Sequence, residues 1–321
     1  MNLDLVLANL LSAPILFFFL GVAASLVRSD LNIAQPVAHF LSLYLLLSIG
    51  FKGGVELSHS GLGPAVLVVL VVAIIAAFAI PIWSFFILRR KLSVEDAGAV
   101  AACYGSISAV TFITAISFLN QTHEPFSGFM VACMALMESP AIISGVLLVR
   151  YMGHSEGQQA AWRSLLHEAL FNGAVVVLIG SLVIGYITGD HGWQEMEPLV
   201  GTPFKAVLAV FLLDMGLVAA KRLHHLRRTG PFLIGFGIVI PVLHAALGIT
   251  VAHFLGLSPG DALLMAVLFG SASYIAVPAA MRIAIPQSNP GIFLPMSLGV
   301  TFPFNIIVGI PLYMGFINLW W

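Results

Sequence analysis

Charged side chains are scarce in this sequence. Lys, Arg, Asp and Glu together make up 8% of its 321 residues, while hydrophobic residues make up 60%. A soluble domain carries about 25% charged residues, so a soluble fold of this composition would lack the polar surface that it needs. The apolar runs are also long, and a membrane helix requires about 20 mostly apolar residues. The sequence therefore predicts an integral membrane protein.

Cysteines are few, and clustered basic residues are missing. The two cysteines, Cys103 and Cys133, both lie inside apolar segments, which excludes a disulfide framework and a metal site built on thiolates. The 13 basic residues are dispersed along the chain, so the sequence lacks the basic face of a nucleic-acid-binding protein. No nucleophile and base stand at a catalytic spacing, so an enzyme is the least favoured class.

Ten apolar segments are long enough to cross a bilayer, and short loops join them. The first segment lacks the basic n-region of a signal peptide, so we expect it to be a membrane helix. The sequence thus predicts an all-α integral membrane protein with ten spans and no soluble domain. The predicted spans are residues 3–27, 35–57, 64–89, 96–119, 126–151, 163–188, 199–220, 231–255, 260–283 and 291–319.

Basic residues are concentrated in alternate loops. When the loops are numbered from one to nine, the odd loops hold 11 of the 13 Lys and Arg residues, and the even side holds only Lys52 and Lys205. Cytoplasmic loops carry an excess of basic residues. The odd loops are therefore predicted to be cytoplasmic, and both termini are predicted to lie on the outer side.

An internal repeat relates the two halves of the chain. Residues 105–108, Gly-Ser-Ile-Ser, correspond to residues 270–273, Gly-Ser-Ala-Ser, and the same offset of 165 relates Asp96 to Asp261. The first repeat is predicted to cover residues 1–155 and the second residues 156–321, with five spans each. Because five is odd, the second repeat enters the bilayer with opposite polarity, and such inverted repeats are typical of secondary transporters.

The two Gly-Ser-x-Ser elements lie near the middle of the fourth and ninth spans. Glycine weakens a helix, and serine can hydrogen-bond to backbone in other conformations, so both spans are predicted to be interrupted and to cross there. The free N–H groups that begin each second half would carry partial positive charge and bind a small anion. The alternative is that these small residues only permit close helix packing. The predicted substrate-binding residues are Gly105, Ser106, Ser108, Gly270, Ser271 and Ser273.

Two acidic residues lie deep in apolar spans, where carboxylates usually mark ion or proton pathways. Glu138, directly before a Ser-Pro pair in the fifth span, is predicted to ligate sodium or to carry a proton. The alternative is a protonated Glu138 hydrogen-bonded to a neighbouring helix. For Asp214 in the seventh span, a structural hydrogen bond and a functional role are equally open. The predicted ion-coupling residues are Ser108, Thr111, Glu138 and Ser273.

Several motifs occur in a distinctive order along the whole chain. They are Asp96 before residues 105–108 with Thr111 after them, Glu138-Ser139-Pro140, residues 270–273 leading to Pro278 and, most specifically, residues 282–290, Arg-Ile-Ala-Ile-Pro-Gln-Ser-Asn-Pro. In these motifs the chain resembles the sodium-dependent bicarbonate transporter family first known from cyanobacteria. The resemblance is that of a divergent member, because the chain has Val110 where the family has a serine, Glu138 in place of Asp, and Tyr274 in place of an Asp.

The resemblance implies sodium-coupled bicarbonate uptake by a homotrimer in a bacterial inner membrane. It also implies an elevator motion between a core domain and a gate domain, each drawn from both repeats. Some members are inhibited by a small PII-type signalling protein, but the long polar insertion that some carry between helices five and six is missing here. Two other functions stay open on the same fold: a proton-coupled or uncoupled carrier of another small carboxylate, and a non-transporting membrane sensor.

Overall fold

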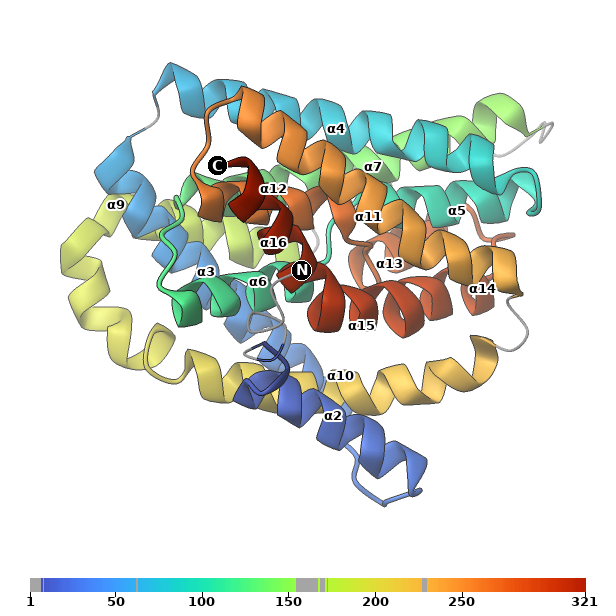
Figure 1. The fold of residues 1–321 in the computed structure, drawn as a ribbon, viewed down its shortest axis with the longest axis horizontal. Helices are drawn as coiled ribbons and strands as arrows, with labels where there is room; N and C mark the ends of the chain where they lie inside the picture. Colours follow the sequence, from blue (N-terminus) through green and yellow to red (C-terminus); the bar gives the residue numbers. More distant parts are fainter. Residues whose placement is uncertain are drawn as a thin grey trace.

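A computed structural model describes residues 7, 9–61, 63–153, 167, 171, 173–226 and 230–321, and Figure 1 shows its fold. Every regular element in these ranges is a helix, as the sequence predicts. The elements are α2 (Ala13–Leu26), α3 (Gln35–Ser60), α4 (Pro64–Leu88), α5 (Val94–Gly105), α6 (Ala109–Thr122), α7 (Phe129–Met152), α9 (Gly173–Val200), α10 (Phe204–Leu226), α11 (Pro231–Phe254), α12 (Pro259–Gly270), α13 (Ala276–Ala284), α14 (Pro290–Leu294), η1 (Pro295–Thr301), α15 (Phe302–Phe304), η2 (Asn305–Gly309) and α16 (Ile310–Trp320).

Seven helical segments among the described residues are long and apolar enough to cross a membrane. They include the α5–α6 pair and the continuous run from α14 to α16, in which η1 and η2 are π-helical. The three other predicted spans coincide with α2 and α12, which are shorter apolar helices, and with α10, which ends in a basic, polar turn. The described helices thus support a multi-pass membrane protein, and the count of ten spans stays a prediction.

Residues 189–198, which the predicted spans 163–188 and 199–220 leave as a polar loop, are instead helical. Helix α9 bends at Gly189, whose φ of 52° and ψ of −140° are not helical, and then continues to Val200. Glycine adopts a positive φ without the steric penalty of a side chain. After the bend, Trp193, Met196 and Val200 pack on Phe51 and Val55 of α3. This apolar contact stabilises as a helix a segment whose charges indicate a loop.

Two helix pairs, α2 with α10 and α3 with α9, pack closely. In Figure 1, α2 and α10 run side by side below the other helices. A Cβ on Gly21 would lie 2.1 Å from the backbone oxygen of Leu213, and one on Gly54 would lie 2.0 Å from that of Leu182. Small residues let membrane helices approach at this distance. An inverted repeat would exchange spans one and six and spans two and seven, and so convert one pair into the other; the repeat itself stays a prediction.

The first turns of α5 and α12 are built alike. The Ser93 hydroxyl accepts from the backbone N–H of Asp96 at 3.1 Å, and the Ser258 hydroxyl accepts from that of Asp261 at 3.2 Å. A serine at this position satisfies an amide that the helix itself leaves unpaired. The cap therefore fixes the start of each interrupted span and the direction of its aspartate.

Each of these aspartates bonds to a segment from the other half of the chain. The Asp96 carboxylate accepts from the backbone N–H of Asn289 at 2.7 Å. The Asp261 carboxylate accepts from the backbone N–H of Ser127 at 2.6 Å and from its hydroxyl at 2.8 Å. These bonds tie the start of each interrupted span to the loop before the last span of the other half.

The close approach of α3 and α9 leads to a stability prediction. We expect Gly54→Ala to destabilise the protein by about 1–3 kcal/mol, the usual cost of forcing a methyl group into a packed interface. Gly180→Ala on α9 is the matched control, because a Cβ there meets nothing within 4 Å. A thiol-reactive dye can follow thermal unfolding, since both cysteines are buried. Equal melting temperatures for the two variants would contradict the predicted contact.

Candidate ion and substrate site

The predicted interruption of the fourth span is confirmed. Helix α5 ends at Gly105 and α6 begins at Ala109, and Ser106 (φ −94°, ψ 175°) is extended. A Cβ on Gly105 would lie 2.2 Å from Cγ of Pro81, so glycine is needed there for close packing against α4. The Ser108 hydroxyl accepts from the backbone N–H of Thr111 at 3.2 Å and begins the second half of the span. The sequence breaks this helix with a glycine that packs and a serine that caps.

The predicted interruption of the ninth span is also confirmed. Helix α12 ends at Gly270, α13 begins at Ala276, and the segment between them is not helical. A Cβ on Gly270 would lie 2.7 Å from the backbone oxygen of Pro241 in α11, which parallels the contact of Gly105 with a proline. The Ser273 hydroxyl accepts from the backbone N–H of Val277 at 3.4 Å. The two breaks thus use the same residue types in the same roles.

The two breaks touch each other through hydrogen bonds. The backbone N–H of Ser108 donates to the Ser271 hydroxyl at 2.9 Å, and the backbone N–H of Ser273 donates to the backbone oxygen of Cys103 at 2.8 Å. Donors engaged in this way are not available to a ligand. In this structure, the Ser271 hydroxyl and these two amides hold the breaks together.

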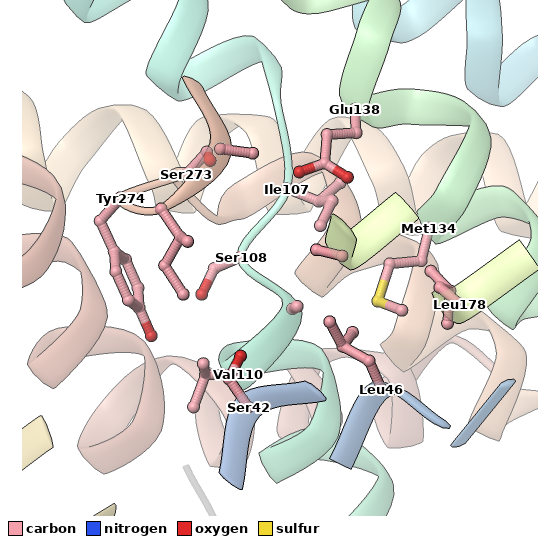
Figure 2. A pocket seen from close by; sticks show the side chains of 14 residues that line it. Ser42, Leu46, Ile107, Ser108, Val110, Met134, Glu138, Leu178, Ser273 and Tyr274 are labelled. Carbon is pink, nitrogen blue, oxygen red and sulfur yellow. The ribbon is translucent and has the colours of Figure 1, made fainter. Parts of the chain in front are cut away.

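A small cavity of about 40 Å³ lies beside the junction of the two breaks. One buried water needs roughly 10–15 Å³, so the cavity has room for about two or three water-sized groups. Figure 2 shows the Glu138 carboxylate of α7 pointing toward the extended segment around Ile107, with Ser273 and Tyr274 on the other side of that segment in this view. The lining residues are Ser42, Leu46, Ile107, Ser108, Ala109, Val110, Met134, Glu138, Ala174, Leu178, Ser273, Tyr274, Ile275 and Ala276.

The structure brings three of the predicted site residues together at this cavity, namely Ser108, Ser273 and Glu138. The other predicted residues do not line the cavity, and the two glycines pack on α4 and α11. The Thr111 hydroxyl donates to that of Ser108 at 2.9 Å. The predicted residues that do not line the cavity are Gly105, Ser106, Thr111, Gly270 and Ser271.

The Ser108 hydroxyl is set up as a donor toward the cavity. Its oxygen already accepts from the backbone N–H and from the hydroxyl of Thr111. A serine hydroxyl has two lone pairs and one hydrogen, so its hydrogen remains to be donated, either to a ligand or to the neighbouring hydroxyl of Tyr274, which also lines the cavity. Ser108 therefore suits an anion better than a cation, and Thr111 acts on the cavity through Ser108.

Glu138 supplies the negative charge of the cavity. Its side chain is 7% exposed, and within the described part of the chain its carboxylate forms no hydrogen bond with another protein group. The alternative of a Glu138 held by a neighbouring helix therefore finds no partner there. The lining includes no Lys or Arg. Because an unpaired charge is costly in a low dielectric, this carboxylate calls for a cation or a proton.

Sequence reasoning missed the residues that helices α3 and α9 contribute. Ser42 and Leu46 come from α3, and Ala174 and Leu178 come from α9. No motif surrounds them, so only the packing of these helices beside the breaks could reveal them. Asp214, which is buried on α10, is not among the lining residues. The cavity therefore lies between the interrupted spans and the α3–α9 pair.

Ser106 and Ser108 differ in a way that can be tested. The Ser106 hydroxyl is fully buried and has no hydrogen-bond partner among the described residues, and such a group is destabilising. We expect Ser106→Ala to leave the melting temperature unchanged or to raise it, and to leave bicarbonate uptake intact. We expect Ser108→Ala to lower uptake about tenfold, because it removes a helix cap and a hydroxyl that faces the cavity. Loss of uptake in the Ser106 variant would return that residue to the substrate site.

Comparison with known proteins agrees with this geometry. No curated protein matches the sequence. A family model described as the Na+-dependent bicarbonate transporter superfamily matches residues 13–318, which include every helix that forms the cavity. The chain therefore belongs to the Na+-dependent bicarbonate transporter superfamily.

Proposed function

We propose that this protein is a secondary transporter that takes up bicarbonate together with sodium. The observation that carries the proposal is the cavity itself, where two symmetric helix breaks and one buried carboxylate meet. The second halves of the interrupted spans, α6 and α13, begin at its wall. The N-terminal end of a helix carries roughly half a positive charge, so these ends can hold a small anion without Lys or Arg.

Coupling to a cation follows from the charge of the cavity. A bicarbonate ion beside the Glu138 carboxylate would place two like charges in a small, poorly hydrated space, and their repulsion would be strong. A sodium ion bound by Glu138 removes that repulsion, so anion and cation favour each other's binding. Sodium in this scheme is a transported ion. A proton on Glu138 would serve the same purpose, which is why proton coupling is the main alternative.

The size of the cavity supports a small inorganic ion. A space for about two or three water-sized groups accommodates bicarbonate and sodium better than a large organic solute. Met134, Leu46 and Leu178 line the same space and reduce the water that competes for the ions. These features favour bicarbonate over larger carboxylates.

The arrangement of helices supports a division into two moving parts. We propose that the α2–α10 and α3–α9 pairs form the gate domain, and that α4 to α7 and α11 to α16 form the core domain that slides in an elevator motion. The cavity lies at the boundary between the two groups, because α3 and α9 contribute to its wall. The homotrimer and the bacterial inner membrane belong to the same proposal. A PII-type partner is its weakest part, and the segment between helices five and six falls largely outside the described residues.

Uptake into liposomes tests the proposed function. Purified protein is reconstituted, and labelled bicarbonate uptake is measured at alkaline pH with and without an inward sodium gradient. We expect the gradient to stimulate uptake. Uptake driven only by a pH gradient would select the proton-coupled carrier, and no uptake of any small anion would favour the sensor.

A further inference from the structure

A second, larger cavity lies between α3, α6, α9 and α10. Its volume is about 390 Å³, and its lining includes Lys52, Asn120, Trp193, Glu197 and Lys205. Two of these side chains are cationic and one is anionic. The cavity differs from the inner one, which has no Lys or Arg in its lining.

Both lysines lack an ion-pair partner among the described residues. The Lys52 ammonium lies 5.9 Å from the centre of the Phe126 ring. The contact of a cation with a ring face positions the ammonium group without neutralising it. An anion that enters the cavity therefore meets two ammonium groups and one carboxylate, which leave a net positive charge.

The acidic residues around the α9 bend are largely engaged elsewhere. Oδ1 of Asp190 lies 2.9 Å from Nε2 of His59, and Oε1 of Glu195 lies 3.7 Å from Nδ1 of His191. Glu195 also lines a different cavity. Glu197 does line this cavity, where its carboxylate accepts from the Thr202 hydroxyl at 2.9 Å. The balance of charge in the cavity remains positive.

The start of α10 adds to the positive potential. Lys205 is in the first turn of α10, and Thr202 and Phe204 at the same helix end also line the cavity. A helix N-terminus attracts anions, and a lysine at that end is unfavourable for the helix itself. The position of Lys205 is thus better explained by an anion than by helix stability.

This cavity and the inner cavity share three lining helices, α3, α6 and α9. On α3, Leu46 lines the inner cavity and Lys52 the larger one, and on α6 the corresponding residues are Val110 and Ile116. Six residues of helix span about 9 Å. In Figure 1, the C-terminal ends of α4 and α7, which carry basic residues, lie at the right, opposite the bend of α9. With the predicted orientation, the larger cavity is on the outer side.

We propose that this cavity is a second anion site, a vestibule in which Lys52 and Lys205 gather small hydrated anions on the outer side. Anion binding there does not depend on transport, whereas the role of the vestibule in bicarbonate uptake rests on the proposed function. A unit charge at roughly 6 Å in water contributes energy on the order of RT. Each lysine should therefore raise the local anion concentration about threefold at low salt.

Trp193 offers a direct readout because it lines the vestibule. Its fluorescence, obtained by difference from the same protein carrying Trp193→Phe, is quenched with iodide and, separately, with neutral acrylamide. We expect Lys52→Gln and Lys205→Gln each to lower the iodide quenching constant about threefold at low salt, and the double variant to lower it further. Acrylamide quenching should not change. The matched control is Lys91→Gln, because Lys91 is exposed and follows the C-terminal end of α4, on the side of the molecule opposite the vestibule.

Two outcomes would overturn the anion site. One is iodide quenching that is unchanged in the double variant. The other is an equal fall in iodide and acrylamide quenching, which would indicate altered access to Trp193 instead of altered charge. If the protein shows no bicarbonate uptake, the quenching result still decides the site, so the two proposals fail separately.

Transport kinetics test the role of the vestibule in uptake. We expect the double variant to raise KM for bicarbonate without lowering the maximal rate. The vestibule changes how often bicarbonate reaches the inner cavity, but it does not change how fast bound bicarbonate is moved across the membrane. The difference should disappear at high salt, where exposed charges are screened. An unchanged KM at low salt would overturn the role in uptake.

Discussion

Sodium-stimulated bicarbonate uptake is expected to be lost when Glu138 is replaced with Gln. The amide has nearly the same shape as the carboxylate but no charge, and the cavity has no other acidic lining residue to hold a cation. We expect the sodium-dependent component of uptake to fall more than tenfold, since a buried carboxylate–cation contact contributes more than an exposed one. The measurement is liposome uptake across a range of sodium gradients.

Two further variants make the Glu138 test specific. Glu138→Asp keeps the charge and should retain coupling with a weaker sodium dependence. Glu195→Gln removes an exposed carboxylate that lines a different cavity, and it should behave like the unaltered protein. Unchanged sodium stimulation in Glu138→Gln would remove this residue from the mechanism. If uptake by the unaltered protein depends on a pH gradient and not on sodium, Glu138 is assigned to proton transfer.

Replacing Asp261 with Ala is expected to cause the largest loss of stability. The side chain is 3% exposed and accepts two hydrogen bonds from Ser127. Without it, both donors lose a charged partner, and each unsatisfied group costs about 1–3 kcal/mol. We expect a loss of about 2–4 kcal/mol, visible as a fall of several degrees in the melting temperature. Asp261→Asn retains an acceptor and should lose less.

The related position in the first half should respond more weakly. Asp96 accepts one hydrogen bond, from Asn289, and is partly exposed, so Asp96→Ala should cost about 1 kcal/mol. Glu95→Ala, one residue away, is the matched control because no bond to Glu95 is present among the described residues. A melting temperature that falls as much in the Glu95 variant as in the Asp261 variant would argue against the cross-repeat bonds as the cause.

Patterns within one segment were enough to predict the helix breaks. Glycine and serine at 105–108 and at 270–273 weaken a helix wherever they occur, so both interruptions could be expected from local chemistry. The importance of Glu138 also follows from one residue, because a carboxylate inside an apolar span is costly in any packing. The stretch 189–198 shows the limit of such reasoning, since its helix depends on contacts with α3.

The different contacts that the four serines make could not be predicted. Ser106, Ser108, Ser271 and Ser273 look equivalent in sequence. In the described part of the chain, however, Ser271 bonds to the backbone of the other break, Ser106 has no partner, and Ser108 and Ser273 line the cavity. Which way a hydroxyl points is set by the geometry of two segments that lie far apart in the chain. The same is true of Thr111, whose hydroxyl reaches Ser108 and not the cavity.

The sequence by itself determined that this chain is a membrane protein of helices and where its helices break, and it predicts two related halves. These properties follow from composition, spacing and local backbone preference, each of which acts within about one helix. Only the tertiary structure decided which polar groups share the inner cavity, and that Lys52 and Lys205 line one vestibule. The reason is physical: hydrogen bonds and electrostatic forces depend on distances in space, which the packing of remote helices sets.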